Sequence, residues 1–202
     1  MTILFILEKF SHVKRILELY NNNLERDKWG NNKGYIIYLN NKYIFVPCVG
    51  SMHVLNNMHT LVKEYNVDLV IRVGTCGIMS LNVSLGQVVL VKKTINKDAI
   101  SERYFPNDKP IVCSKFVDQI KNSLGIESKT AYTVDVLWDK PDKRADVVDM
   151  ESSALYCYGN HNNVDCISIS VCRDNSTGAL SREKTEDTIR KVVQAILKMF
   201  EG

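Results

Sequence analysis

Short runs of apolar residues alternate along the chain with segments in which apolar residues recur every three or four positions. The runs predict buried strands, and the three-to-four spacing predicts amphipathic helices. The first run covers residues 2–7, and a helix is predicted next over 13–20. Further strands are predicted at 35–39, 43–46, 68–73, 87–92, 130–134, 146–150 and 166–171. Further helices are predicted at 51–65, 114–124, 152–158 and 181–200.

The connections between these segments carry turn residues or polar residues. Asn40-Asn41 separates two predicted strands and indicates a two-residue hairpin turn, because asparagine tolerates positive φ. The strand 68–73 is predicted to stop at a tight turn over 74–77 that contains two glycines. The segments 21–33 and 96–110 are polar, and we expect both to be surface loops.

The order of the elements indicates an α/β protein. Strands and helices alternate without a change of composition, an internal repeat or a linker. A chain of 202 residues is long enough to bury a substantial core as one domain. We therefore expect a single domain over 1–202, built as three α/β/α layers around a central mixed sheet.

Composition excludes some classes of function. The chain is 45% hydrophobic and 24% charged, which is ordinary for a globular protein, and its net charge of +3 is spread without a basic block. We therefore expect no nucleic-acid or membrane partner. The apolar run at 2–7 is too short for a signal sequence, and no apolar stretch approaches the ~20 residues that span a bilayer. The expected location is the cytoplasm.

Six cysteines raise the question of a metal site or disulfides. They form no Cys-x-x-Cys pair, and no histidine lies at the spacing of a zinc ligand. Most of them lie inside apolar runs, where a free cysteine behaves as a small buried hydrophobe. We therefore expect reduced, structural thiols and no metal.

Polar residues follow three of the predicted buried strands, and ligands of α/β sheets bind at strand ends. The first group is Arg72-Val73-Gly74-Thr75-Cys76-Gly77, where two glycines let backbone N–H groups approach an anion and Arg72 adds a bidentate donor. A tight turn with an arginine paired to a carboxylate explains the same residues. The motif alone does not decide between the two.

The other two groups contain carboxylates. Asp149 and Glu151 lie two positions apart in a strand, so both point to the same side. They can bind hydroxyls, do acid–base chemistry or simply solvate a strand end. Arg173 and Asp174 follow directly after a very apolar strand, and they form either a capping ion pair or part of a site.

Taken together, the three groups resemble the nucleoside phosphorylase family, in the branch of hexameric purine nucleoside phosphorylases and uridine phosphorylases. The motif 72–77 resembles the family's phosphate loop, and Val148-Asp149-Met150-Glu151-Ser152-Ser153-Ala154 resembles its ribose motif. The resemblance covers about residues 34–200. It implies phosphorolysis of a nucleoside N-glycosidic bond, with inorganic phosphate as co-substrate and no cofactor. It also implies a homodimer or a hexamer made of three dimers.

The resemblance also implies roles for individual residues. Arg72, Gly74 and Thr75 would bind phosphate, and Glu151 would hold the ribose 2′- and 3′-hydroxyls. Val49 and Met150 would pack against the nucleoside.

For the base, Asp174 would protonate a purine at N7, and Arg182 would reach Asp174 and assist that transfer. Leu137 or Trp138 would pack on the base. An anion near C1′ stabilises the oxocarbenium character of the transition state, and a general acid helps the base to leave.

Two positions depart from the family pattern. His12 lies where the family has a phosphate-binding arginine, and a histidine carries full charge only below its pKa. The alternative is a surface histidine that starts a helix. Arg26 and Lys28 are weak candidates for the basic residue that the family borrows from a neighbouring subunit. Arg173 lies where purine phosphorylases have a small residue, and uridine phosphorylases have a base-reading arginine in this segment.

Several functions therefore stay open. Asp174 favours purine nucleosides, whereas Arg173 keeps a uridine phosphorylase possible. A nucleosidase of the methylthioadenosine or adenosylhomocysteine type uses water, and such enzymes usually lack an arginine at the position of Arg72. From a different class, an inactive nucleoside-binding module would not need Arg72, Glu151, Asp174 and Arg182 together.

Overall fold

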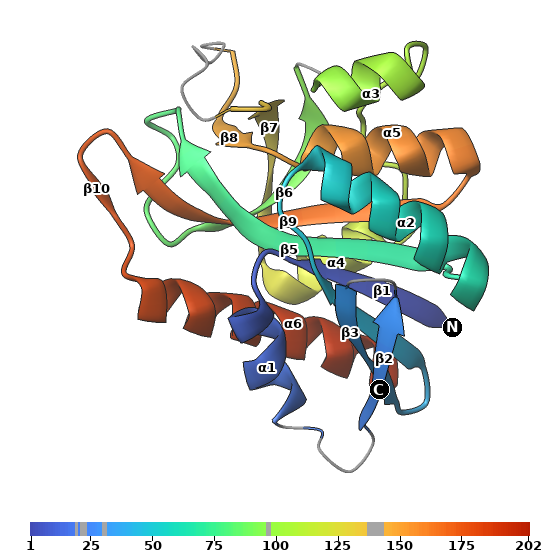
Figure 1. The fold of residues 1–202 in the computed structure, drawn as a ribbon. Helices are drawn as coiled ribbons and strands as arrows, with labels where there is room; N and C mark the ends of the chain where they lie inside the picture. The colour runs from blue at the N-terminus through green and yellow to red at the C-terminus, as the bar shows by residue number, and fades with distance from the viewer. Residues whose placement is uncertain (19, 21–23, 30–31, 96–97, 137–143) are drawn as a thin grey trace.

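The computed structural model describes residues 1–18, 20, 24–29, 32–95, 98–136 and 144–202. Its strands form one mixed sheet, flanked by helices on both faces (Figure 1). The strands are β1 Thr2–Leu7, β2 Leu24–Trp29, β3 Asn32–Tyr38, β4 Lys42–Pro47, β5 Leu69–Ile78, β6 Val88–Thr94, β7 Glu127–Thr133, β8 Val147–Asp149, β9 Asp165–Asn175 and β10 Gly178–Ala179. The helices are α1 Phe10–Leu17, α2 Ser51–Tyr65, α3 Ala99–Tyr104, α4 Val117–Leu124, α5 Ser152–Asn162 and α6 Arg182–Glu201. This arrangement confirms the predicted fold class, a three-layer α/β/α domain with a central mixed sheet.

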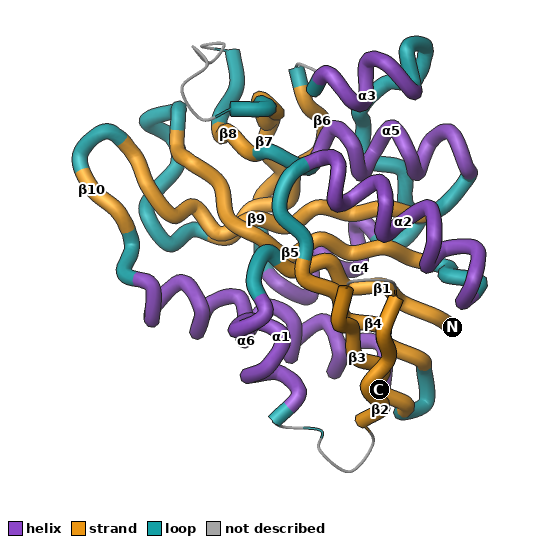
Figure 2. Tube along the Cα trace, in the orientation of Figure 1, coloured by secondary structure: helices purple, strands orange, loops and turns teal. Residues whose placement is uncertain are grey.

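The sheet has β5 near its centre. The strand order is β10-β9-β6-β7-β8-β5-β1-β4-β3-β2, and β5 also pairs with β9 in parallel. This extra pairing closes β5, β9, β6, β7 and β8 into a ring, while β1 to β4 extend the sheet on the other side of β5 (Figure 2). Because β1, β5 and β9 are mutually parallel, their carboxyl ends meet at one edge of the sheet.

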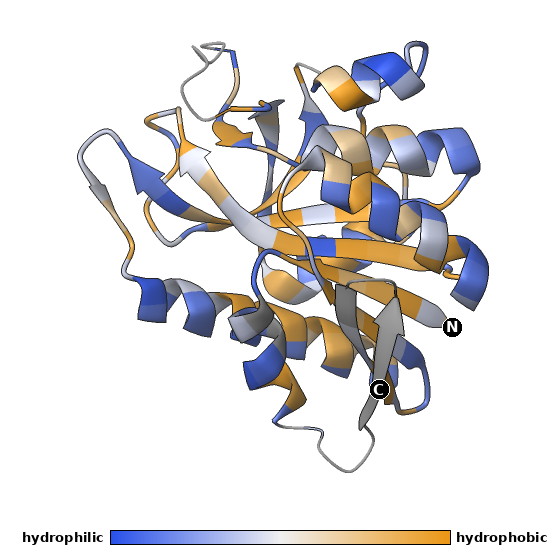
Figure 3. Cartoon of the chain, viewed as in Figure 1, coloured by the Kyte–Doolittle hydropathy of each residue, from blue (hydrophilic) through white to orange (hydrophobic). Residues whose placement is uncertain are grey.

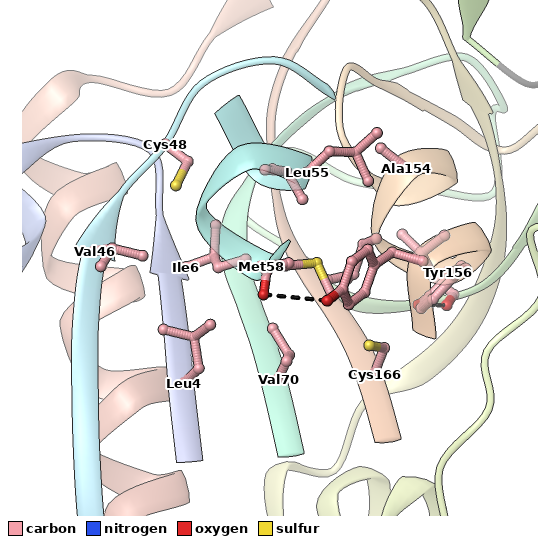
Figure 4. Packing of buried hydrophobic residues seen from close by; sticks show 14 of the residues in the cluster. Leu4, Ile6, Val46, Cys48, Leu55, Met58, Val70, Ala154, Tyr156 and Cys166 are labelled. Atoms are coloured by element: carbon pink, nitrogen blue, oxygen red, sulfur yellow. Dashed lines mark hydrogen bonds between the residues drawn. The ribbon is translucent and has the colours of Figure 1, made fainter. Parts of the chain in front are cut away.

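Two apolar clusters hold the helices against the sheet. One lies under α2 and α5 and includes Leu55, Met58 and Ala154 (Figure 4). The other lies under α1, α4 and α6 and includes Ile16, Ile120 and Ile189. Helices such as α2 and α6 turn hydrophobic faces to the sheet and polar faces outward, which is the amphipathic pattern read from the sequence (Figure 3). In α5, by contrast, residues 152–159 are all buried. No helix within the described ranges is both long and apolar enough to cross a bilayer.

Three expectations about the elements were wrong. The polar segment 21–33 contains the edge strand β2, which pairs with β3 through backbone hydrogen bonds and so does not need an apolar sequence. The segment 96–110 contains α3, capped by the Asp98 side chain. The hairpin at Asn40-Asn41 exists, but no non-glycine residue there has positive φ.

A fourth wrong expectation concerns the glycine motif after residue 73. β5 does not stop at Val73 but continues through Gly74 and Gly77 to Ile78. These residues keep pairing with β9, where Gly74 lies opposite Ser170 and Gly77 opposite Asp174. The segment 74–77, predicted to be a tight anion-binding turn and called the anion cradle below, is therefore part of an extended strand paired with β9, with a register irregularity after Cys76.

Five of the six cysteines are buried, as their apolar surroundings in the sequence predicted, and Cys113 is partly exposed. Cys76 and Cys172 lie opposite each other on β5 and β9, with their sulfur atoms 3.7 Å apart.

Candidate active site

Arg72 lies at the centre of the candidate site. It is 1% exposed, on β5 between β1 and β9. Its Nη2 lies 2.6 Å from Oε2 of Glu151 and 3.2 Å from Oε1 of Glu8, and its Nη1 lies 3.9 Å from Oδ2 of Asp149. Burial lowers the pKa of Arg72, but the three carboxylates outweigh burial, so the net shift is upward and the guanidinium stays charged.

Two serines on β9 also hold the guanidinium. Nη1 of Arg72 donates to the hydroxyls of Ser168 at 3.3 Å and Ser170 at 3.0 Å. The expectation of a fully apolar strand at 166–171 is therefore wrong on this face. A buried guanidinium needs acceptors for its five donors, and these hydroxyls supply two of them. Nε of Arg72 has no partner among the described residues.

Glu8, directly after β1, lies in the predicted anion cradle. Its carboxylate accepts hydrogen bonds from the Thr75 backbone N–H, from the Thr75 hydroxyl at 2.9 Å and from Arg72. A Cβ atom at Gly74 would lie 2.5 Å from Oε1 of Glu8 and 2.7 Å from Nη2 of Arg72, so a side chain at this position would displace one of these two groups. The structure thus shows the alternative of an arginine paired to a carboxylate, and phosphate binding by this motif stays a prediction.

Asp149 and Glu151 are both buried, so the alternative of a solvated strand end is wrong. Asp149 accepts hydrogen bonds from Ser152 and Thr133 and ties β7 to the start of α5. Burial raises the pKa of Asp149, and the nearby Arg72 opposes that shift. Oε1 of Glu151 accepts a hydrogen bond from the Gly50 backbone N–H at 2.8 Å, while Oε2 accepts one from Arg72. Oε1 therefore keeps a lone pair for one further donor.

Asp174 and Arg173 lie on β9 next to the glycine end of β5. A Cβ atom at Gly77 would lie 3.2 Å from Oδ1 of Asp174, so the glycine gives this carboxyl room. The predicted contact between Arg182 and Asp174 is not what the structure shows. Arg182 begins α6, and its Nε donates to Glu186 one turn further on at 2.8 Å.

A cavity of about 50 Å³ lies against Glu8 on the side of α1 and α6. Its lining residues are Glu8, Lys9, His12, Thr75, Arg173, Arg182, Thr185 and Glu186. His12 is buried and 3% exposed, so the alternative of a surface histidine is wrong. Burial lowers the pKa of His12 to about 4, and the imidazole is therefore neutral at pH 7. It adds no positive charge for a phosphate.

The other predicted site residues are exposed, partly buried or outside the described residues. Val49 precedes Gly50 and is 52% exposed, and Met150 is partly buried between Asp149 and Glu151. Trp138 and Leu137 lie outside the described residues, as do the side chains of Arg26 and Lys28. Within the described ranges, no group of three or more histidine, cysteine or acidic side chains is placed to hold a metal ion.

Sequence reasoning missed Glu8, Ser168 and Ser170 as site residues. Glu8 shows the same signal that singled out Arg173 and Asp174, a charge directly after an apolar strand. The serines alternate with Ile167 and Ile169, and this alternation indicates a strand with one polar face.

Comparison with known proteins gives three kinds of match. A family model described as "Phosphorylase superfamily" matches residues 3–202. A purine nucleoside phosphorylase of the DeoD type from Thermoanaerobacter sp. (strain X514) is 28% identical over 162 residues, which cover 71% of this chain and 69% of the relative. A DeoD-type relative from Buchnera aphidicola subsp. Baizongia pistaciae is 23% identical and covers 82% of this chain and 74% of its own length.

Solved structures share the fold. Uridine phosphorylase from Vibrio fischeri superposes with a TM-score of 0.85 at 18% identity, covering 98% of this chain and 90% of that one. The methylthioadenosine/adenosylhomocysteine nucleosidase of Campylobacter jejuni has a TM-score of 0.81 at 16% identity, covering 100% and 99%. The matches thus include phosphorylases and a nucleosidase. With a family model spanning nearly its whole length, the chain belongs to the phosphorylase superfamily.

Proposed function

We propose that this protein cleaves the N-glycosidic bond of a nucleoside and that water is the nucleophile. Water is favoured as the nucleophile because the Glu8 carboxylate occupies the anion cradle, where it is bound by Thr75 and Arg72. Glu8, Asp149 and Glu151 surround the single guanidinium of Arg72. At 4 Å and an effective dielectric constant of 20, two like unit charges repel by about 4 kcal/mol. A phosphate ion beside Glu8 would meet this repulsion, whereas a water molecule would not.

The other residues supply the remaining steps of the proposed reaction. Glu151 accepts a ribose hydroxyl on Oε1, and Asp174 gives a proton to the leaving base. The C1′–N bond breaks, and its electron pair goes to the base nitrogen. Water forms the new C1′–O bond and passes a proton to Glu8. A carboxylate near C1′ also stabilises the positive charge that develops on the sugar. Asp174 favours a purine, which accepts a proton at N7.

Phosphorolysis is the second candidate, and specific observations favour it. Arg72 and Thr75 both donate hydrogen bonds to the Glu8 carboxylate and so could hold a phosphate in its place. The relatives that are 23–28% identical are named purine nucleoside phosphorylases. In this case Glu8 would have to leave the cradle before phosphate binds. The neutral imidazole of His12 would give that phosphate no charge.

A groove lined by residues of α2, α3 and α5 supports the proposal of a homodimer or a hexamer. Its lining is mainly apolar and includes Met52 and Tyr104, which are 50% and 61% exposed. Exposed apolar side chains gathered in one groove are typical of a protein interface. Sedimentation of the purified protein at several concentrations tests this assembly.

The proposed reaction is tested with a panel of inosine, adenosine, uridine and methylthioadenosine. Release of the free base is measured in phosphate-free buffer and again with added phosphate. We expect equal rates in the two buffers and fastest release from a purine nucleoside. Release that requires phosphate would favour the second candidate. Binding of a nucleoside in calorimetry without any release would identify an inactive binding module.

A further inference from the structure

The first turns of α5 contact β9 at the position that holds Arg72. Ser152, the first residue of α5, donates its hydroxyl hydrogen to Asp149, and its oxygen lies 2.8 Å from the hydroxyl oxygen of Ser168 on β9. Tyr156, one turn further along α5, accepts the backbone N–H of Ser168 on its hydroxyl at 3.0 Å. Ser168 is fully buried, and α5 therefore fixes it through both its backbone and its side chain.

These contacts form a hydrogen-bond chain whose direction is set at both ends. A guanidinium can only donate, so Nη1 of Arg72 donates to the Ser168 hydroxyl at 3.3 Å. Asp149 accepts hydrogen bonds from Thr133 and from the N–H and hydroxyl of Ser152, and such acceptance favours the ionised carboxylate. Because the hydroxyl hydrogen of Ser152 goes to Asp149, the hydrogen between the two serines comes from Ser168. Each hydroxyl thus accepts one hydrogen and donates one.

The chain determines how the guanidinium of Arg72 is turned. Ser168 and Ser170 hold Nη1 on the side of β9. Nη2 is then directed to the carboxylates of Glu8 at 3.2 Å and Glu151 at 2.6 Å. In the proposed reaction one of these carboxylates takes the proton of the nucleophile and the other holds the sugar. Their placement therefore depends on Arg72, and a displacement of about 1 Å in an active site can slow a reaction by about 10²-fold.

We propose that Ser168 is a positioning residue: its hydroxyl, anchored by α5, fixes the guanidinium of Arg72 between the carboxylates of the site. The inference rests on the proposed function. Ser168 is fully buried, so it acts through Arg72 and not on the substrate. Without the hydroxyl, Arg72 can turn about its terminal bonds, and Glu8 and Glu151 shift with it.

The test is a double-mutant cycle on base release, with Ser168→Ala and Arg72→Lys as the single changes. Ser168→Ala removes the hydroxyl without adding volume, and kcat should fall by about 10–100-fold. Arg72→Lys keeps the charge, but one ammonium group does not reach the serines and both carboxylates as a planar guanidinium does. In the Arg72→Lys background, Ser168→Ala should therefore change kcat by less than about threefold. A merely structural role would give independent losses that add in free energy.

Ser153→Ala is the matched control. Ser153 follows Ser152 in α5 and is also fully buried, but its hydroxyl has no partner in the part of the chain that the structure describes. Loss of this hydroxyl should leave kcat at the wild-type value. A fall in kcat as large as that of Ser168→Ala would show that any buried hydroxyl lost near the start of α5 disturbs the site, and it would overturn the inference.

Two further results would overturn it. One is a folded Ser168→Ala variant with the wild-type kcat, and the other is an equal loss from Ser168→Ala in the wild-type and Arg72→Lys backgrounds. If Ser168→Ala shows no cooperative thermal melt, Ser152→Ala, which breaks the same chain, is judged by the same cycle. If Arg72→Lys releases too little base to measure, the cycle is read from inosine binding in calorimetry.

Failure of the proposed function is distinguishable from failure of this inference. A wild-type protein that releases no base from any nucleoside of the panel, with or without phosphate, rejects the proposed function and the inference with it. An active wild-type protein whose double-mutant cycle is additive rejects the inference alone.

Discussion

Replacing Glu8 by glutamine removes one negative charge from the cradle and keeps an oxygen that can accept the Thr75 hydrogen bonds. The two candidate reactions respond to this change in opposite directions. If Glu8 takes the proton of a water nucleophile, Glu8→Gln removes the base, and hydrolysis should slow by about 10²–10⁴-fold. If Glu8 only occupies the place of phosphate, the variant should bind phosphate more tightly.

The expected gain in phosphate affinity of Glu8→Gln is estimated from the contacts of Glu8. Its carboxylate lies 3.2 Å from Nη2 of Arg72, so a phosphate on the same guanidinium would lie within a few ångströms of it. The repulsion is about 4 kcal/mol per unit of phosphate charge at 4 Å and an effective dielectric constant of 20. Removal of this repulsion would lower the KM for phosphate by orders of magnitude.

The assay measures base release by wild type, Glu8→Gln and Glu186→Gln over a range of phosphate concentrations. Glu186 is a fitting control, because it lines the same cavity but pairs with Arg182 rather than Arg72. We expect a large loss of phosphate-independent release in Glu8→Gln and little change in Glu186→Gln. Faster, phosphate-dependent release by Glu8→Gln would refute the assignment of Glu8 as the base.

Three further predictions concern neighbouring residues. Arg72→Ala leaves the buried carboxylates of Asp149 and Glu151 without their cation, so the free energy of unfolding measured in urea should fall by about 3–5 kcal/mol. An unchanged urea midpoint would contradict the structural role of Arg72. Asp174→Asn should slow purine nucleoside cleavage by about 10²–10⁴-fold and 7-methylguanosine cleavage much less, because the latter base leaves without a proton; equal slowing of both would reject Asp174 as the acid. The pKa of His12 is lowered from 6.5 to about 4, so the unfolded chain binds more protons in that window, and the free energy of unfolding should fall as the pH drops from 6.5 to 4. This pH dependence should be weaker in His12→Asn. An equal slope of unfolding free energy against pH in wild type and His12→Asn would show that another group causes the dependence.

The alternation of strands and helices was enough to predict the fold class, because buried strands such as β1 and amphipathic helices such as α6 have clear periods. β2 could not be found in this way. Its sequence is Leu-Glu-Arg-Asp-Lys-Trp, and an edge strand of this kind exists through backbone pairing with β3. The extension of β5 through its glycines was missed for a related reason. Glycine usually interrupts a strand, but here β9 continues to pair alongside.

For the site, the sequence identified Arg72 and Glu151 as a group, and the structure brings their side chains to 2.6 Å. The local sequence pattern does not determine the direction of a side chain at a strand end. For this reason Glu8 was not predicted to enter the cradle, and Arg182 was predicted to reach Asp174 although it pairs with Glu186. Both outcomes depend on how β1, β9 and α6 meet, which is a property of the packed sheet.

The central claim is that water attacks the sugar while Glu8 occupies the anion cradle. The most direct measurement is the identity of the sugar product when a purine nucleoside is incubated with the protein and isotopically labelled phosphate. We predict free ribose without the label, formed at the same rate when phosphate is left out. Labelled ribose 1-phosphate as the main product would contradict the claim and show that Glu8 gives way to phosphate.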